Sequence, residues 1–167
     1  MLLIKWCLII IAVIVLITVL AGQSGLFKGN KPDDLGVRDG KLKPPAATPN
    51  SVTSQAKLYP EHPQQDYADI SPLAVYGDGQ NTLSLIKAII EATAGAQLIE
   101  SQSDYLYAQF TTPLLKFVDD VEFWFEPNSN VIHVRSASRL GRSDLGVNRR
   151  RIETIRQQLD ALGLVNE

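Results

Sequence analysis

The sequence predicts an α+β domain in which a four-stranded antiparallel meander carries two helices on one face, preceded by an N-terminal transmembrane helix. Two alternating strand patterns, over 118–126 and 131–140, are joined by a turn-forming stretch at 127–130. Two more strand patterns come before them, and one helical pattern lies on each side of these four strands. Because the connections are short, successive strands should pair antiparallel and both helices should pack on the same face.

The chain begins with an apolar stretch that predicts a membrane anchor over residues 1–22. No charged residue occurs in 6–22, where isoleucine, valine and leucine dominate. Extended back to Leu2, the stretch has about the 20 residues that a bilayer-spanning helix needs. A cleaved signal peptide is the alternative, because Val19 and Ala21 satisfy a small-residue cleavage rule.

The charges around this helix bear on its orientation in the membrane. Only Lys5 and the terminal amine precede its apolar part, whereas five basic residues follow within 28–43. A strict positive-inside count would keep the domain in the cytosol. Very short N-termini usually stay inside, however, and we therefore expect a single-pass protein whose domain is exported.

Residues 23–57 are predicted to form a spacer rich in proline and glycine. Seven of the nine prolines and four glycines lie between Gln23 and Pro72, with almost no sustained apolar pattern. Such a segment cannot bury enough apolar surface to offset the entropy of ordering it. The α+β domain is therefore expected over 58–167.

Each element of that domain has its own local signal. The first helix has Asp78 or Asn81 as its N-cap, apolar residues at helical spacing, and Gly95 in the stop position. The last helix begins near Asn148, and Gly163 ends it. The four strands are expected at 97–102, 105–111, 118–126 and 131–140.

The turn at 127–130 also predicts how its two strands pair. A symmetric loop of two or four residues sets Glu122 opposite Arg135 and Trp124 opposite His133, whereas a three- or five-residue loop would slip this register by one. One face of the pair is then apolar and should be covered by the helices. The other face gathers Asp120, Glu122, Glu126, His133, Arg135 and Arg139.

This charged face has two interpretations. It could be a solvated ladder of ion pairs, each contributing well under about 1 kcal/mol when exposed. It could instead be a ligand or partner surface, because Trp124 is unusual on a wet face and exposed aromatic residues beside arginines are common at interfaces. Tyr105 and Tyr107 alternate in a neighbouring strand, and the sequence leaves open whether they join this face.

Arginine is concentrated near the C-terminus. Three arginines, Arg149 to Arg151, occupy the first turn of the last helix, where the helix dipole disfavours positive charge by roughly 0.3 to 1 kcal/mol each. Either nearby acids, such as Asp144, Glu153 or the Asp119-Asp120 pair, neutralise them, or they form a site for a phosphate, a lipid headgroup or an acidic partner. The predicted ligand-binding residues are Arg135, Arg139, Arg142, Arg149, Arg150 and Arg151.

Asp119 and Asp120 with His133 form the basis of a hydrolase hypothesis. Adjacent strand residues point to opposite faces, so a catalytic pair would require a bulge. No G-x-S-x-G motif surrounds any serine, and Cys7, the single cysteine, lies in the apolar N-terminus. We therefore predict no catalytic residue, metal ligand or cofactor, and the net charge of −2 does not indicate a nucleic-acid partner.

Three segments carry a family resemblance: FVDDVEF, VRSASRLGRSDLGVNRRRIE and the upstream PNSVTSQ. They closely resemble the bacterial and plastid family called domain of unknown function 1499, over roughly Pro49 to Leu162. Ser51 stands where that family commonly has cysteine. The family is uncharacterised, so the resemblance implies domain boundaries without an activity. We expect the membrane to be a bacterial inner membrane. It singles out Asp119, Asp120, Arg135, Ser136, Ser138, Arg139, Asp144, Asn148, Arg149, Arg151 and Glu153, and we expect its acidic, serine and asparagine members, with Glu122, to be structural.

Taken together, these patterns predict a membrane-anchored binding or assembly module rather than an enzyme. Its Arg/Asp-rich surface would contact an acidic ligand, an anionic lipid or a protein partner. One alternative is a hydrolase that uses Asp119 or Asp120 with His133. The other is a purely architectural network that fastens the last helix to the sheet.

Overall fold

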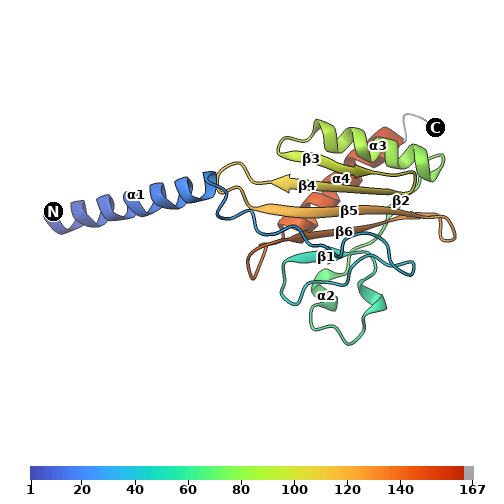
Figure 1. Ribbon diagram of the computed structural model, residues 1–167, viewed down its shortest axis with the longest axis horizontal. Coiled ribbons are helices and arrows are strands. Elements are labelled where there is room, and N and C mark those ends of the chain that lie inside the picture. The colour runs from blue at the N-terminus through green and yellow to red at the C-terminus, as the bar shows by residue number, and fades with distance from the viewer. Residues whose placement is uncertain (164–167) are drawn as a thin grey trace.

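A six-stranded antiparallel sheet lies at the centre of the structure, a computed structural model that describes residues 1–163 (Figure 1). Its strands are β1 (Ser51–Thr53), β2 (Leu73–Ala74), β3 (Ala96–Ser101), β4 (Tyr105–Thr111), β5 (Val118–Glu126) and β6 (Val131–Ser138). Their spatial order is β1-β6-β5-β4-β3, and β2 pairs with the other end of β6. The prediction of an antiparallel sheet is confirmed, but the prediction of four strands is wrong.

The two additional strands are too short to produce an alternating pattern in the sequence. β1 has three residues and lies in the proline-rich stretch, whereas β2 has two residues and directly follows Pro72. Each is formed by pairing with β6, where Val52 lies opposite Ser136 and Leu73 lies opposite Ile132. Val52 and Leu73 are fully buried, so tertiary packing rather than local propensity makes these strands.

The hairpin of β5 and β6 has the register that the sequence predicts. Glu122 pairs with Arg135, Trp124 with His133, and the four-residue turn 127–130 joins the strands. Asn130 in that turn has a φ of 51°, a left-handed conformation that asparagine tolerates better than most residues. The alternation of β5 and β6 therefore places one set of side chains towards the helices and the other set away from them.

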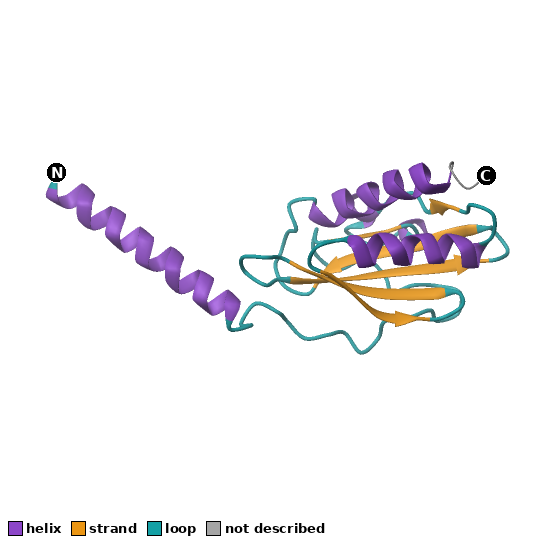
Figure 2. Cartoon of the chain, turned by 90° about the horizontal axis from the view of Figure 1, so that it is seen from above, coloured by secondary structure: helices purple, strands orange, loops and turns teal. Residues whose placement is uncertain are grey.

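Two helices, α3 (Gly79–Ala92) and α4 (Val147–Gly163), cover one face of the sheet (Figure 2). Asp78 is the N-cap of α3, and its Oδ1 accepts a hydrogen bond from the Asn81 amide at 2.7 Å. Two short helices, η1 (Ala56–Leu58) and α2 (Gln65–Ala68), lie between β1 and β2 in the chain. The main core between the sheet and the helices includes Leu83, Ile86, Ile90, Leu106, Val121, Phe123, Ile132, Val134, Ile152, Ile155 and Leu159.

The opposite face of the sheet is covered by residues 31–48, which we call the strap. Figure 1 shows this segment passing in front of the sheet, and Figure 2 shows it on the side away from α3 and α4. Leu42 of the strap is 1% exposed and packs with Tyr105, Tyr107 and Trp124 in a second apolar cluster. Part of the segment predicted as a spacer is therefore folded against the sheet.

The N-terminal helix α1 (Leu2–Gln23) projects away from the domain (Figures 1 and 2). It is long and apolar enough to cross a membrane, and the most apolar part of it is not buried by the rest of the chain. A signal sequence near an N-terminus has the same length and composition. The helix that the sequence predicts is thus present, and its role as an anchor is taken up below as a proposal.

Candidate functional site

Asp119 and Asp120 of β5 point to opposite faces of the sheet, as the strand period predicts. Asp119 contacts Arg151 of α4, whereas Asp120 contacts Arg139 on the strap side. Both carboxylates are nearly buried, at 4% and 1% exposure. The two acids therefore belong to separate polar networks, one under the helices and one under the strap.

Arg151 organises the network on the helix side. Its Nη2 donates to Asp119 Oδ2 at 2.5 Å, and its Nη1 donates to Asn148 Oδ1 at 2.7 Å and to Ser136 Oγ at 2.9 Å. The guanidinium also lies over the Phe110 ring, 4.7 Å from its centroid. Arg151 is thus neutralised inside the chain and fastens α4 to β5 and β6.

Asp144 accepts hydrogen bonds from backbone amides at the start of α4. Its carboxylate accepts hydrogen bonds from the amides of Gly146 and Asn148, at 3.0 and 2.9 Å, and from the Tyr67 hydroxyl. Burial acts to raise the pKa of Asp144, but these hydrogen bonds outweigh it and hold the pKa below its ordinary value. A negative charge at the helix N-terminus also offsets part of the repulsion that the arginines there experience.

Asn148 connects α4 to β6 and to Asn50, the residue that precedes β1. Its Nδ2 donates to the carbonyl of Asn50, to Ser138 Oγ and to Asp144 Oδ2 at 2.9 to 3.0 Å. Its Oδ1 accepts from Ser136 Oγ at 2.6 Å as well as from Arg151. These contacts bring together the serine, asparagine and aspartate positions that the family resemblance singles out on the helix side.

The other arginines at the start of α4 donate to backbone carbonyls. Arg149 Nη2 donates to Tyr67 O at 2.6 Å, and Arg150 Nη1 donates to Leu145 O at 2.9 Å. Glu153 pairs with Arg156 at 3.0 Å instead of with these residues. Arg142 is exposed in the β6–α4 loop. The helix-start arginines are therefore largely engaged within the fold.

Glu122 and Arg135 form a buried pair beneath the strap. Glu122 Oε1 accepts from the Gly36 amide at 2.7 Å and from the Tyr105 hydroxyl at 2.9 Å, and Oε2 lies 3.6 Å from Arg135 Nη1. Burial raises the pKa of Glu122 although the positive charge of Arg135 opposes the shift. Burial likewise lowers the pKa of Arg135, and Glu122 opposes that shift.

Asp120, Arg139 and Tyr107 form a second cluster on the strap side. Arg139 donates to both carboxylate oxygens of Asp120, from Nε at 2.9 Å and from Nη2 at 2.7 Å. The Tyr107 hydroxyl donates to Asp120 Oδ1 at 2.6 Å, and burial raises the pKa of Tyr107 to about 12. Tyr105 and Tyr107, which the sequence left unplaced, therefore join the charged face.

His133 lies away from both aspartates and is held by other groups. Its Nδ1 is 3.0 Å from Ser54 Oγ, its Nε2 is 3.1 Å from Glu126 Oε2, and its ring stacks on Trp124. The hydrolase hypothesis requires His133 and the aspartates to converge. The observed positions separate them, so the geometry does not support that hypothesis.

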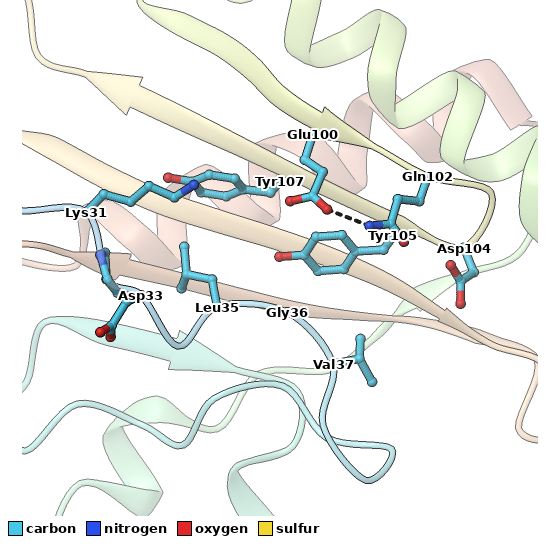
Figure 3. A pocket seen from close by; sticks show the side chains of 11 residues that line it. Lys31, Asp33, Leu35, Gly36, Val37, Glu100, Gln102, Asp104, Tyr105 and Tyr107 are labelled. Carbon is cyan, nitrogen blue, oxygen red and sulfur yellow. Dashed lines mark hydrogen bonds between the residues drawn. The ribbon is translucent and has the colours of Figure 1, made fainter.

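A recess of about 700 Å³ lies between the strap and the edge formed by β3 and β4 (Figure 3). Asp33, Glu100 and Asp104 line it together with the strap residues Leu35 and Val37 and the rings of Tyr105 and Tyr107. Lys31 lies over the Tyr107 ring, with Nζ 4.8 Å from the centroid. Sequence reasoning missed this recess because its carboxylates come from segments about 70 residues apart, without a shared motif.

Comparison with known proteins supplies a family and no activity. Residues 1–163 contain no group of three or more His, Cys, Asp and Glu side chains that could hold a metal ion. No curated protein matches the chain. The family model described as "Protein of unknown function (DUF1499)" matches residues 41–159, which include the end of the strap, the whole sheet and most of α4. The chain belongs to this DUF1499 family of proteins of unknown function.

Proposed function

We propose that this chain is a membrane-anchored, non-catalytic binding module that holds an organic cation in the recess between the strap and β4. The observation that carries the proposal is the chemistry of this recess, which Asp33, Glu100 and Asp104 line and in which the Lys31 ammonium lies over the Tyr107 ring (Figure 3). The arginine networks act as the scaffold that holds both faces of the sheet.

The arginines favour this scaffold role because their charges are already matched. Arg135, Arg139 and Arg151 each face a carboxylate in the sheet, and each of these carboxylates is nearly buried. An acidic ligand would have to displace these internal partners and leave buried carboxylates unpaired, which is strongly unfavourable. The acidic-ligand hypothesis therefore rests on the exposed Arg142 and Arg150 and on the half-buried Arg149, which donates to a backbone carbonyl rather than to a carboxylate.

The recess carries a net negative charge, in contrast to the arginine-rich surface. Asp33, Glu100 and Asp104 contribute three negative charges against the single positive charge of Lys31. Tyrosine faces attract ammonium groups, and Lys31 shows that an ammonium reaches the Tyr107 ring. Leu35 and Val37 supply apolar contact for a hydrocarbon body. An amine with an aliphatic chain matches all three features.

Calorimetric titration of the full chain in zwitterionic lipid nanodiscs tests this function, with spermidine as the probe and 1,8-octanediol as an uncharged comparison. We expect spermidine to bind and the diol not to bind. The double variant Asp33→Asn with Glu100→Gln should weaken spermidine binding by about tenfold or more, because two charge-assisted contacts are lost. The matched control is Glu61→Gln with Asp66→Asn, which removes two exposed carboxylates outside the recess and should leave binding unchanged.

Two results would overturn the proposal. One is equal spermidine affinity in the recess variant, the control variant and the unchanged protein. The other is selective binding of inorganic phosphate that disappears in Arg142→Gln, which would support the acidic-ligand hypothesis instead.

We also propose that α1 is an uncleaved anchor in a bacterial inner membrane and that the domain is exported. The support is the length and apolar composition of α1. A Ser103→Cys variant in a Cys7→Ser background should react with a membrane-impermeant maleimide in intact spheroplasts, since Ser103 is exposed. Labelling that requires lysis would place the domain in the cytosol, and a purified chain lacking the mass of residues 1–22 would show cleavage.

A further inference from the structure

The end of α1 is docked against the domain rather than freely linked to it. Gly22 is buried, and a Cβ added there would come within 2.7 Å of the Leu115 carbonyl oxygen. Gln23 Nε2 donates to the carbonyls of Pro113 and Leu114 at 3.2 and 2.9 Å. The β4–β5 loop is therefore held at the same level as the last turn of α1.

The residues that follow α1 continue this docking. The Phe27 ring stacks on Phe117 with centroids 5.3 Å apart. A Cβ at Gly29 would lie 2.8 Å from Arg139 Cβ and 3.0 Å from Leu140 Cγ, so the backbone passes directly over the start of the β6–α4 loop. Both loops thus lie at the end of the sheet from which α1 emerges (Figure 1).

Large apolar side chains are exposed on this end of the domain. Leu145 is 83% exposed and Leu114 is 58% exposed, one in each loop. Leu26, Leu140 and Val147 are exposed as well. A small hollow of about 170 Å³ lies between the loops, and Phe117, Leu140, Leu145 and Val147 line it together with five polar residues. Apolar groups gathered beside a membrane helix fit the boundary between headgroups and acyl chains.

The charges around these leucines are basic. Lys28, Lys116 and Arg142 lie in the three segments 22–29, 112–117 and 139–147, and the only acidic residue in those segments is Asp144. Asp144 is 9% exposed and engaged by the start of α4. The accessible charge beside the leucines is therefore positive, which matches a bilayer that contains anionic lipids.

We propose that the loops 112–117 and 139–147 form a membrane-contact surface that rests in the headgroup layer of an anionic bilayer, with Leu114 and Leu145 inserted below it. The inference rests on the part of the proposed function that makes α1 an uncleaved span, and it does not depend on the cation recess. α1 has 22 residues, which corresponds to a length of about 33 Å and places Gln23 at the edge of a hydrocarbon core of about 30 Å. Because Gln23 contacts the β4–β5 loop directly, that loop lies at the same depth.

Site-specific fluorescence of the full chain in nanodiscs tests this surface. An environment-sensitive dye is attached to Leu145→Cys, Leu114→Cys or Ser103→Cys, each in a Cys7→Ser background, and lipids spin-labelled near the headgroup serve as quenchers. Position 103 is the matched control, because Ser103 is exposed in the β3–β4 turn at the far end of the sheet. We expect quenching at 145 and 114 to exceed that at 103 by about threefold or more, as for side chains buried in the interface.

The charge requirement is tested in the same preparation. Replacing Lys28, Lys116 and Arg142 with glutamine should reduce quenching at position 145 in phosphatidylglycerol nanodiscs. Each lost positive charge should lower the ratio of membrane-docked to undocked loops by about fivefold. In phosphatidylcholine alone the substitution should have little effect. Quenching at 145 that equals the value at 103 in both lipids would overturn the proposal, and so would an undiminished signal in the triple variant. Spermidine binding is measured separately, so failure of the recess and failure of this surface remain distinguishable.

Discussion

Arg151 shows how a single residue can carry a positive charge at a helix start without a ligand. The sequence indicates that something must compensate Arg149 to Arg151, and it names Asp144, Glu153 and the Asp119-Asp120 pair as candidates. The structure selects Asp119 for Arg151 and backbone carbonyls for the other two. Asp144 instead binds the backbone amides, and Glu153 binds Arg156.

Removal of the Arg151 charge should therefore be costly. In Arg151→Gln, Asp119 would remain almost buried without its ion-pair partner, and we expect a loss of about 3 kcal/mol in the free energy of unfolding. Arg142→Gln removes the same charge from an exposed site and should change stability by about 0.5 kcal/mol or less. Urea titration of the full chain in detergent micelles measures both, and equal midpoints for the two variants would contradict the buried network.

Asp144 should make the free energy of unfolding depend on pH in the acidic range. Its pKa is lowered in the folded state, so its contribution is fully present above the unfolded pKa of about 3.9 and is lost as the pH falls through the folded pKa. Asp144→Asn should lower the free energy of unfolding by about 1 kcal/mol at pH 7. Below about pH 4, the free energy of unfolding of this variant should fall less steeply with pH than that of the unchanged protein.

Urea midpoints measured from pH 7 down to about pH 2.5 test this pH dependence. Asp66→Asn, which changes an exposed aspartate in α2, is the control and should follow the unchanged protein. An acid decline that is identical in Asp144→Asn and in the unchanged protein would exclude Asp144 as its source.

At the scale of elements, the strap is the main difference from the sequence-based expectation. Its prolines and glycines are typical of a spacer, yet its backbone amides at Gly36 and Leu42 donate to Glu122 and Gln55 at 2.7 and 2.8 Å. A backbone segment without regular structure can pack on a sheet when side chains accept its hydrogen bonds.

The strap should consequently contribute to stability as core elements do. Leu42→Ala removes a side chain that is 1% exposed, and we expect a loss of about 2 to 4 kcal/mol. Leu58→Ala removes the same atoms from a position that is 49% exposed and should cost about 1 kcal/mol or less. Thermal and urea unfolding compare the two variants, and a small effect at both positions would mean that the strap behaves as a free spacer.

For the whole molecule, the two polar networks share strands β5 and β6, and both apolar clusters include side chains of β5. The helices cover one face of the sheet and the strap covers the other. Detachment of either the helices or the strap would therefore expose buried charges. We expect the strap to open together with the sheet.

Hydrogen exchange of the full chain measures this coupling. The amides of Gly36 and Leu42 should exchange at rates close to those of β5, because their acceptors are buried side chains held by the sheet. Amides at the exposed positions 103 and 128 provide the fast reference. Exchange of Gly36 and Leu42 at the reference rate would show that the strap opens independently.

The sequence by itself indicated α1, the four longer strands and the two long helices, and it gave the pairing of Glu122 with Arg135 for a symmetric turn. These features follow from local periodicity and turn length, which are present in any window of a few residues. The opposite orientations of Asp119 and Asp120 have the same origin, since the strand period alone separates them.

Only the tertiary structure decided what covers the second face of the sheet and what neutralises the arginines. The hydrogen bond from Gly36 to Glu122 joins residues 86 positions apart, and the one from Arg149 to Tyr67 joins residues 82 positions apart. The recess likewise unites the strap with β4 and the end of β3. No local pattern encodes such contacts, because they depend on the path of the whole chain and on which buried groups must find a partner.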